Sequence, residues 1–232
     1  MTSGPEQRVP EKGSGDLTDS PQAILLRLMM AQRAMENPKR EGTAASILEA
    51  SVSIFAKRGY AGTSMRDIAK EVGIKAASIY EYYSGKDRLL YAALVHVWAR
   101  FYDYVIGGLD PDKPPLDQLH AVIEHHLAWQ SGLADVASGW DALFDLQGIS
   151  DVLPKELAEE LQTHRSLYHE FVASLIVAER PGIEHPQARA EAILSLCNSV
   201  TRWSQSLLDG EVADMGWDFA LALLGDGSPP AG

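Results

Sequence analysis

The chain has 232 residues, of which 46% are hydrophobic, so it can form one large globular domain or two modest ones. Its formal net charge of −12 argues against a general nucleic-acid coat protein, and it has no run of about 18 apolar residues that would predict a membrane span. The start lacks the pattern of a secretory signal and the single cysteine, Cys197, can form no internal disulfide, so we expect a cytoplasmic protein.

Residues 1–20 are rich in Gly, Pro, Ser and charged residues, which is typical of a disordered leader. Residues 22–36 predict a short amphipathic helix, which ends at Asn37 because the residue before a proline avoids the helical region. From Thr43 onward, apolar residues recur at helical spacing and no segment alternates with period two, so we expect an all-α fold. About nine helices are predicted there, over residues 43–58, 64–72, 76–83, 86–106, 114–130, 133–146, 154–180, 186–208 and 214–224.

The segment from residue 63 to residue 90 has the local signals of a helix-turn-helix. Ser64 can cap the first helix, with Asp67 three residues later as the acid of a capping box. Gly73 stands where the turn needs a positive φ, which glycine adopts without strain. Ser84 and Asp87 repeat the capping pattern before the next helix.

In a helix-turn-helix the second helix enters the major groove and the first crosses the DNA backbone. The early residues of the second helix then face base edges, where Lys75 can donate to guanine, while nearby hydroxyl and ammonium groups meet phosphates. Residues 39–90 carry nine Lys and Arg against six Asp and Glu, whereas residues 91–232 carry seven against twenty-one, so only the first segment suits phosphates. The predicted DNA contacts are Thr63, Ser64, Lys75, Ala76, Ala77, Ser78, Tyr80, Tyr82 and Lys86.

The ordered strings FAKRGY, TS, RDIA, VG, IYEYY and GKDRLL resemble the tetracycline-repressor (TetR) family of bacterial transcription regulators. The chain departs from the common pattern at Ala76, where lysine or proline is frequent, and at Glu81, where histidine is frequent; Glu81 would repel phosphate and is not a predicted contact. The resemblance implies a cytoplasmic homodimeric repressor that leaves a palindromic, double-stranded operator when a small, largely apolar molecule binds.

The same resemblance divides the chain into four parts. They are an amino-terminal extension (1–40), a three-helix DNA-binding domain (41–88), a helical ligand-binding and dimerisation domain (89–226) and a tail (227–232).

Large aromatic side chains are spread over several helices of the predicted ligand-binding domain. Such residues suit a mostly apolar pocket, although core packing is their commoner use. The VTRW string around Arg202 is similar to members that sense acyl-coenzyme A thioesters, which implies that Arg202 meets a ligand phosphate, the alternative being an interface arginine. The predicted ligand contacts are Trp98, Tyr102, Trp129, Trp140, Phe144, Tyr168 and Arg202.

An apolar stripe on the helix predicted over 186–208 needs a surface to cover it, and the family resemblance implies that a second copy of the chain does so. The predicted interface residues are Ile193, Leu196, Val200, Trp203 and Leu207. His120 and Glu124 share one helix face, but too few ligands lie there for a closed zinc site, so we expect no metal.

Two alternatives remain open, an all-helical enzyme and a helical interaction module that does not bind DNA. The sequence has no Gly-rich phosphate loop, no G-x-S-x-G elbow and no H-E-x-x-H motif, and Cys197 lies in an apolar pattern. We therefore expect neither catalysis nor a cofactor. Residues 63–86 distinguish a DNA-binding regulator from both alternatives, because neither alternative requires a helix-turn-helix.

Overall fold

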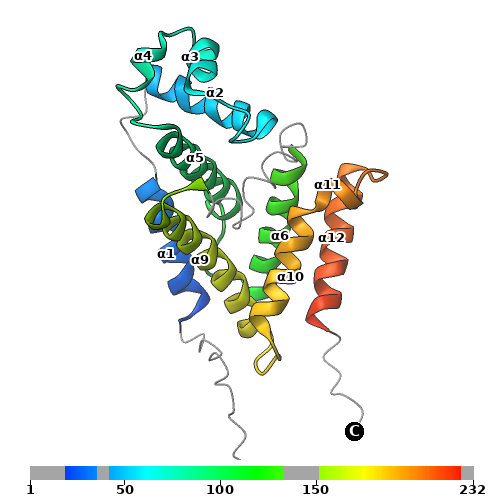
Figure 1. Ribbon diagram of the computed structural model, residues 1–232. Coiled ribbons are helices and arrows are strands. Elements are labelled where there is room, and N and C mark those ends of the chain that lie inside the picture. Colours follow the sequence, from blue (N-terminus) through cyan, green and yellow to red (C-terminus); the bar gives the residue numbers. More distant parts are fainter. Residues whose placement is uncertain (1–18, 36–41, 133–151, 226–232) are drawn as a thin grey trace, which may run out of the picture.

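The computed structural model of the protein describes residues 19–35, 42–132 and 152–225. In these ranges the regular elements are ten helices, which confirms the all-α class (Figure 1). Their bounds are α1 Pro21–Met35, α2 Thr43–Arg58, α3 Met65–Val72, α4 Ala76–Ile79, α5 Lys86–Ile106, α6 Pro115–Gly132, α9 Lys155–Glu179, α10 Pro186–Asn198, α11 Val200–Trp203 and α12 Asp209–Leu224. None of these helices combines the length and hydropathy needed to cross a membrane.

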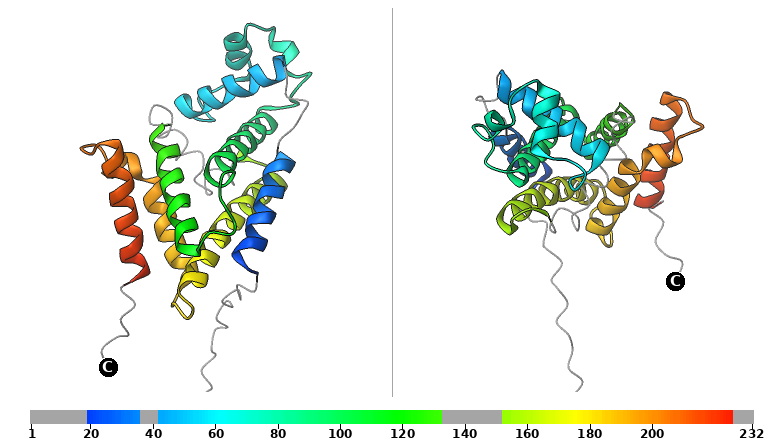
Figure 2. Two further views of the ribbon diagram at one scale, coloured as in Figure 1. Left: turned by 180° about the vertical axis from the view of Figure 1, so that it is seen from behind. Right: turned by 45° about the horizontal axis from the view of Figure 1, so that its top comes forward.

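The helices form two parts that share α5. Helices α2, α3 and α4 make a small unit at one end, and α1, α5, α6, α9, α10, α11 and α12 make the larger body (Figures 1 and 2). Helix α5 packs against α2 in the small unit and against α1, α6 and α9 in the body. Because both parts bury side chains of α5, a change in the tilt of α5 would move packed side chains in both parts.

The small unit has its own apolar core. Helix α2 buries Ile47, Leu48, Ile54 and Phe55 on one face, as its helical spacing predicts. It ends at Gly59, which takes φ = 69° and donates its N–H to the carbonyl of Phe55.

The body is closed by helix α1, whose partner the sequence did not indicate. Helix α1 lies against α5 and α9 on the side of the body away from α12 (Figure 2). Its inward residues Ile24, Leu25 and Leu28 are at most 2% exposed. On its outer side, Arg27 bridges Asp19 and Glu170, with nitrogen to oxygen distances of 3.0 and 3.4 Å.

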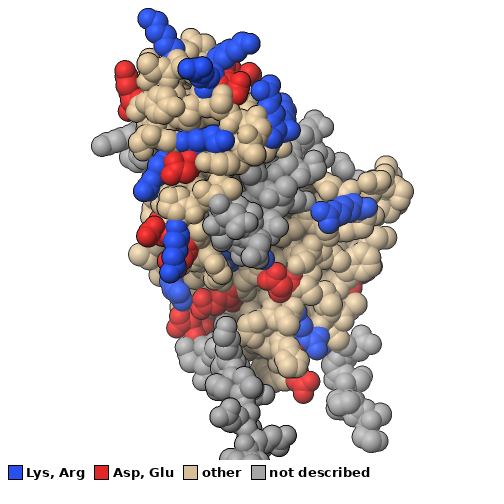
Figure 3. All heavy atoms as spheres, in the orientation of Figure 1, with Lys and Arg blue, Asp and Glu red and all other residues tan. Residues whose placement is uncertain are grey.

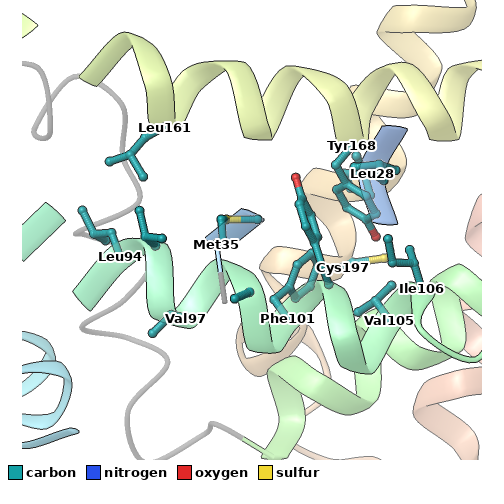
Figure 4. Packing of buried hydrophobic residues seen from close by; sticks show 14 of the residues in the cluster. Leu28, Met35, Leu94, Val97, Phe101, Val105, Ile106, Leu161, Tyr168 and Cys197 are labelled. Atoms are coloured by element: carbon teal, nitrogen blue, oxygen red, sulfur yellow. The ribbon is translucent and has the colours of Figure 1, made fainter. Parts of the chain in front are cut away.

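Between α5 and α9 the core is lined by side chains of both helices. Leu94 and Phe101 reach from α5 toward Leu161 and Tyr168 of α9, with Cys197 of α10 beside them (Figure 4). Cys197 is completely buried, which confirms its prediction as a small core residue, and burial raises the pKa of its thiol to about 12.

The helix predicted over 186–208 is broken, which corrects the prediction. Helix α10 ends at Asn198, and the single turn α11 follows Ser199. The carbonyl of Leu196 accepts from the hydroxyl of Ser199 at 3.1 Å and from the indole Nε1 of Trp203 at 3.0 Å. These side-chain donors take the carbonyl that a continuous helix would pair with the N–H of Val200.

Two other predicted bounds differ from the structure or fall outside it. Helix α12 begins at Asp209 rather than 214. The carboxylate of Glu211 accepts from the N–H of the N-cap residue Leu208 at 2.8 Å, which gives this otherwise unpaired N–H a partner and favours the earlier start. The helix predicted over 133–146 lies outside the described residues.

The packing of α1 gives a matched pair of substitutions. Leu28→Ala removes a fully buried side chain and should lower the free energy of unfolding by ~2–5 kcal/mol. Leu26→Ala, on the outer face with 59% of the residue exposed, should change it by less than about 0.5 kcal/mol. Chemical denaturation of both variants measures the difference, and equal effects would show that α1 does not dock as described.

Candidate functional site

Helix α3 begins with the capping box that the sequence predicts. The hydroxyl of Ser64 accepts from the N–H of Asp67 at 3.2 Å, and the Asp67 carboxylate accepts from the N–H of Ser64 at 2.9 Å and from its hydroxyl at 2.5 Å. These hydrogen bonds from Ser64 lower the pKa of Asp67. The start of α3 is therefore fixed by groups next to it in the sequence.

The turn after α3 also has the predicted geometry. Gly73 takes φ = 75°, in the left-handed region that a side chain would strain. The N–H of Ile74 reaches back to the carbonyl of Ala69 at 2.9 Å, which closes the helix in a Schellman-type turn. Lys75 then stands at the N-cap of α4, exposed to solvent.

The second helix is shorter than the eight residues predicted. Only Ala76–Ile79 is α-helical, and the chain continues to Tyr83 in tighter turns, such as the 3.2 Å bond from the N–H of Tyr82 to the carbonyl of Ile79. Ile79 is fully buried and anchors this segment, whereas Tyr80 and Tyr82 are 55% and 45% exposed. The segment therefore turns a polar and aromatic edge outward.

Five of the nine predicted DNA contacts are exposed, but Thr63 is not. Thr63 is only 3% exposed, and its hydroxyl donates to the carbonyl of Gly59 at 2.8 Å. Its side chain closes the loop between α2 and α3 and cannot reach a phosphate, which corrects the prediction. Of the other predicted contacts, the exposed ones are Ser64, Lys75, Ala77, Tyr80 and Tyr82, and the half-buried ones are Ala76, Ser78 and Lys86.

Lys86 is held inside the protein rather than presented outward. Its Nζ donates to the carbonyls of Tyr60 at 2.7 Å and Thr63 at 2.8 Å, and lies 3.9 Å from the centre of the Tyr60 ring. Burial, and then the charge of Asp87, raise the pKa of the Tyr60 hydroxyl. Lys86 thus ties the first turn of α5 to the loop before α3. The predicted cap by Ser84 is absent, since Gly85 is the N-cap of α5 and makes no side-chain bond.

The end of the molecule formed by α2, α3 and α4 carries Lys and Arg side chains with a few acidic ones among them (Figure 3). The exposed basic residues of this unit and of the first turn of α5 are Lys57, Arg58, Arg66, Lys70, Lys75 and Arg88. This surface is suited to a polyanion even though the whole chain carries a net charge of −12.

In the body, four of the predicted ligand contacts gather around Phe101, which is not itself one of the predicted contacts. The Phe101 ring centre lies 5.5 Å from that of Trp98, 5.9 Å from Tyr102, 5.9 Å from Trp129 and 5.3 Å from Tyr168. The position of Phe101 on the apolar stripe of α5 predicts a core residue, but not that its ring contacts all four of these aromatic side chains. Tyr102 is fully buried and donates to the carbonyl of His164 at 2.5 Å.

Polar side chains adjoin these rings, and the sequence analysis did not connect them. His126 is 3% exposed, and its Nε2 lies 2.9 Å from the Oδ1 of Asn198 while its Nδ1 lies 3.2 Å from the hydroxyl of Tyr168. Burial lowers the pKa of His126 to about 4, against the smaller opposing effect of the hydrogen bond with Asn198. The ring is therefore neutral at neutral pH.

The remaining predicted ligand contacts are not part of this cluster. Arg202 is exposed on α11, and Trp140 and Phe144 lie outside the described residues. Among the described residues, no three His, Cys, Asp or Glu side chains are placed to hold a metal ion. His120 instead packs its ring 4.5 Å from that of Trp217.

The predicted dimer stripe is largely covered within the single chain. Ile193 and Val200 are fully buried, so they offer no surface to a second copy, and their prediction as interface residues is wrong. Leu196, Trp203 and Leu207 are half-buried. The exposed apolar side chains in this region are Leu208, Met215 and Phe219, at 74%, 36% and 40%.

A helix-turn-helix unit joined by one long helix to an all-helical body is the architecture that the family resemblance implies, and the comparison with known proteins agrees with it. Residues 47–93 match the family described as "Bacterial regulatory proteins, tetR family". The matched residues cover α3 and α4, most of α2 and the first two turns of α5.

Relatives and solved structures extend this result. The HTH-type transcriptional repressor KstR2 of Mycobacterium tuberculosis is 36% identical over 93 residues, covering 35% of this chain and 44% of its own. The negative transcriptional regulator IcaR of Staphylococcus epidermidis is 26% identical over 125 residues, covering 53% and 64%. The chain thus spans about half the length of the curated relatives it matches.

Solved structures match over more of the chain. A tetR-family regulatory protein from Rhodococcus RHA1 has a TM-score of 0.68 at 24% identity, over 80% of this chain and 98% of its own. AibR, solved in complex with isovaleryl coenzyme A and operator DNA, has a TM-score of 0.64 at 21% identity, over 77% and 97%. These structures share the fold of the helical body as well as that of the small unit.

The internal contacts of Lys86 can be distinguished from the phosphate contact predicted from the sequence. Lys86→Met should lower the free energy of unfolding by ~1–3 kcal/mol, because two partly buried carbonyls lose a charged donor. Arg88→Met removes the same charge from an exposed position in the same helix turn and should leave stability unchanged. Denaturant titrations of both variants decide the matter. Equal denaturation midpoints would mean that the hydrogen bonds of Lys86 to Tyr60 and Thr63 do not stabilise the fold in solution.

Proposed function

We propose that the protein is a sequence-specific DNA-binding transcription regulator that acts as a repressor on a palindromic operator. The observation that carries the proposal is the outward edge of the α3–α4 unit, where Lys75, Tyr80 and Tyr82 are exposed around the buried anchor Ile79. The match of this domain to the tetR family and the names of the relatives as transcriptional regulators support it. Residues 41–88 are the proposed DNA-binding domain, and residues 89–226 the proposed ligand-binding and dimerisation domain.

The exposed groups suit two kinds of DNA contact. Lys75 is exposed at the start of α4, which suits donation to base edges, and the small side chain of Ala77 would let the backbone approach the groove. The exposed hydroxyls of Tyr80, Tyr82 and Ser64 suit contacts to phosphates, which position the protein without reading sequence. Thr63 is left out of this set, and Lys86 contributes by holding the loop before α3.

Single substitutions on the outward edge test the proposal. Lys75→Ala should weaken operator binding by ~1–3 kcal/mol, and Tyr80→Ala should weaken it similarly, because each removes a direct contact. Lys113→Ala removes an exposed lysine outside the small unit and is the matched charge control. Mobility-shift titrations at fixed salt, with DNA from beside the protein's own gene, measure all three. Parent-like binding by both edge variants would refute the assignment.

We further propose that two copies of the chain pair through the α11–α12 region. Phe219 and Trp203 pack edge to face with ring centres 5.8 Å apart, and Phe219, Met215 and Leu208 remain exposed in the single chain. A second copy related by two-fold symmetry would cover these side chains and would place two recognition segments on a palindrome.

The dimer is tested by a charge placed in the exposed apolar patch. Phe219→Glu should convert the dimer to a monomer at micromolar concentration, because association would bury an unpaired carboxylate. Ala34→Glu, exposed on the outer face of α1, adds the same charge elsewhere and should leave a dimer. Light scattering gives the mass of each species. A parent protein that is monomeric at this concentration would end the proposal.

We propose, finally, that a largely apolar effector releases the operator, with an acyl-coenzyme A as the candidate class. The ring cluster around Phe101 supports an apolar site, and the solved complex of AibR with isovaleryl coenzyme A supports the candidate class. The effector must favour a spacing of the two recognition segments that does not fit DNA. Helix α5 carries Trp98 and Phe101 in the cluster and Lys86 at the other end, so a tilt of α5 would link the two events.

This mechanism makes a reciprocal prediction. Calorimetry with isovaleryl-coenzyme A, longer acyl-coenzyme A thioesters and the free acids should find a ligand that lowers operator affinity. Saturating operator DNA should then lower the affinity for that ligand by the same factor, since coupling is symmetric. The release mechanism fails if none of these compounds binds, or if operator affinity is unchanged when one does.

A further inference from the structure

A chain of four polar side chains runs beside the ring cluster in the body. Tyr168 of α9, His126 and Gln130 of α6, and Asn198 of α10 are joined by hydrogen bonds of 3.2, 2.9 and 3.0 Å. Tyr168 and His126 are 2% and 3% exposed, whereas Asn198 is exposed at the end of its helix. The chain therefore leads from the sealed core to an accessible amide.

The direction of these hydrogen bonds follows from the neutral state of His126. A neutral imidazole has one N–H, and the Oδ1 of Asn198 can only accept, so Nε2 is the donor and Nδ1 accepts from the Tyr168 hydroxyl. The amide of Gln130 donates to the same Oδ1. Two donors on one oxygen hold the Asn198 amide in a single orientation.

This orientation leaves the amide nitrogen of Asn198 as the outward group of the chain. Its Nδ2 carries two N–H donors, and no described residue accepts from them. A fixed donor at an exposed position costs a ligand little reorganisation, because its partners already hold it.

Aromatic side chains adjoin the polar chain at His126. His126, Trp129 and Gln130 lie on one face of α6, being three and four residues apart. Phe101 of α5 contacts the His126 ring at 4.9 Å between centres and the Trp129 ring at 5.9 Å. Trp129 and Trp98, which both contact the Phe101 ring, are only half-buried.

We propose that Asn198 is the polar recognition residue of the effector site and donates to a neutral oxygen of the effector, a ketone, ester, thioester or amide carbonyl. The apolar body of the effector lies against Trp129 and Trp98. None of the four polar side chains carries a charge, so a carboxylate would lose its hydration here without gaining a cationic partner. This inference rests on the proposed effector sensing and names the chemical group that the site selects.

The test uses three small probes that share one apolar body. They are 2-acetylnaphthalene with a neutral carbonyl, 2-ethylnaphthalene without an acceptor, and 2-naphthoate with a carboxylate. The DNA-free full chain is titrated with each while tryptophan fluorescence and the side-chain amide signals of Asn198 are followed by NMR. The ketone should bind ~3–10-fold more tightly than the hydrocarbon and the carboxylate, as one hydrogen bond to a neutral acceptor allows. Its binding should shift the Asn198 amide signals.

Asn198→Asp is the decisive variant. The carboxylate still accepts from His126 and Gln130 but offers the ligand no donor, so the preference for the ketone should disappear while 2-ethylnaphthalene binds as before. Ala188→Asp adds the same charge at an exposed site on α10 and should keep the preference. If Asn198→Asp unfolds, Gln130→Ala replaces it; freeing the amide to rotate should reduce the ketone preference.

The inference is overturned if no probe binds up to its solubility limit, if the ketone has no advantage, or if Asn198→Asp retains that advantage. Because the assay contains no DNA, such a failure leaves operator binding unaffected. A failure of operator binding likewise leaves the probe titrations interpretable.

Discussion

The burial of one helix by both parts of the molecule is the constraint on which the rest depends. Helix α5 has 21 residues and so extends about 30 Å, from the loop that precedes α3 to the far side of the body. Twelve of its residues are buried, against α2 at one end and against α1, α6 and α9 along the body. A helix packed on so many sides moves as a rod, because bending it would open gaps in a close-packed core. In the proposed release mechanism, a shift of α5 at Phe101 is therefore carried to Lys86.

Local signals were sufficient to predict much of the small unit. The capping box at Ser64, the positive φ of Gly73 and the bounds of α5 each depend on residues within a few positions of one another, and each is found as expected. The destinations of Thr63 and Lys86 could not be predicted in this way. The carbonyls that hold Lys86 lie 26 and 23 residues earlier in the chain, and only the packing of α5 against α2 brings them within reach.

The body shows a second limit of sequence analysis. Periodicity identified the apolar side of the 186–208 segment, but not whether the same chain or another would cover it; Ile193 and Val200 are covered internally. Four of the predicted aromatic residues do gather, but the predicted contacts included neither their common neighbour Phe101 nor the polar side chain of His126. The hydrogen bonds from His126 and Gln130 to Asn198 join residues 72 and 68 positions apart, a relation that no spacing rule contains.

Helix α1 precedes the segment that matches the tetR family, which begins at residue 47. It is packed into the body on α5 and α9, and seven residues, 36–42, join it to α2. Seven residues can span at most about 25 Å, so the small unit is attached to the body at both of its chain ends, through this connection and through the start of α5. A part held at one point can rotate in any direction. A part held at two points turns mainly about the line between them. For the small unit, that line runs from the end of α1 to the start of α5.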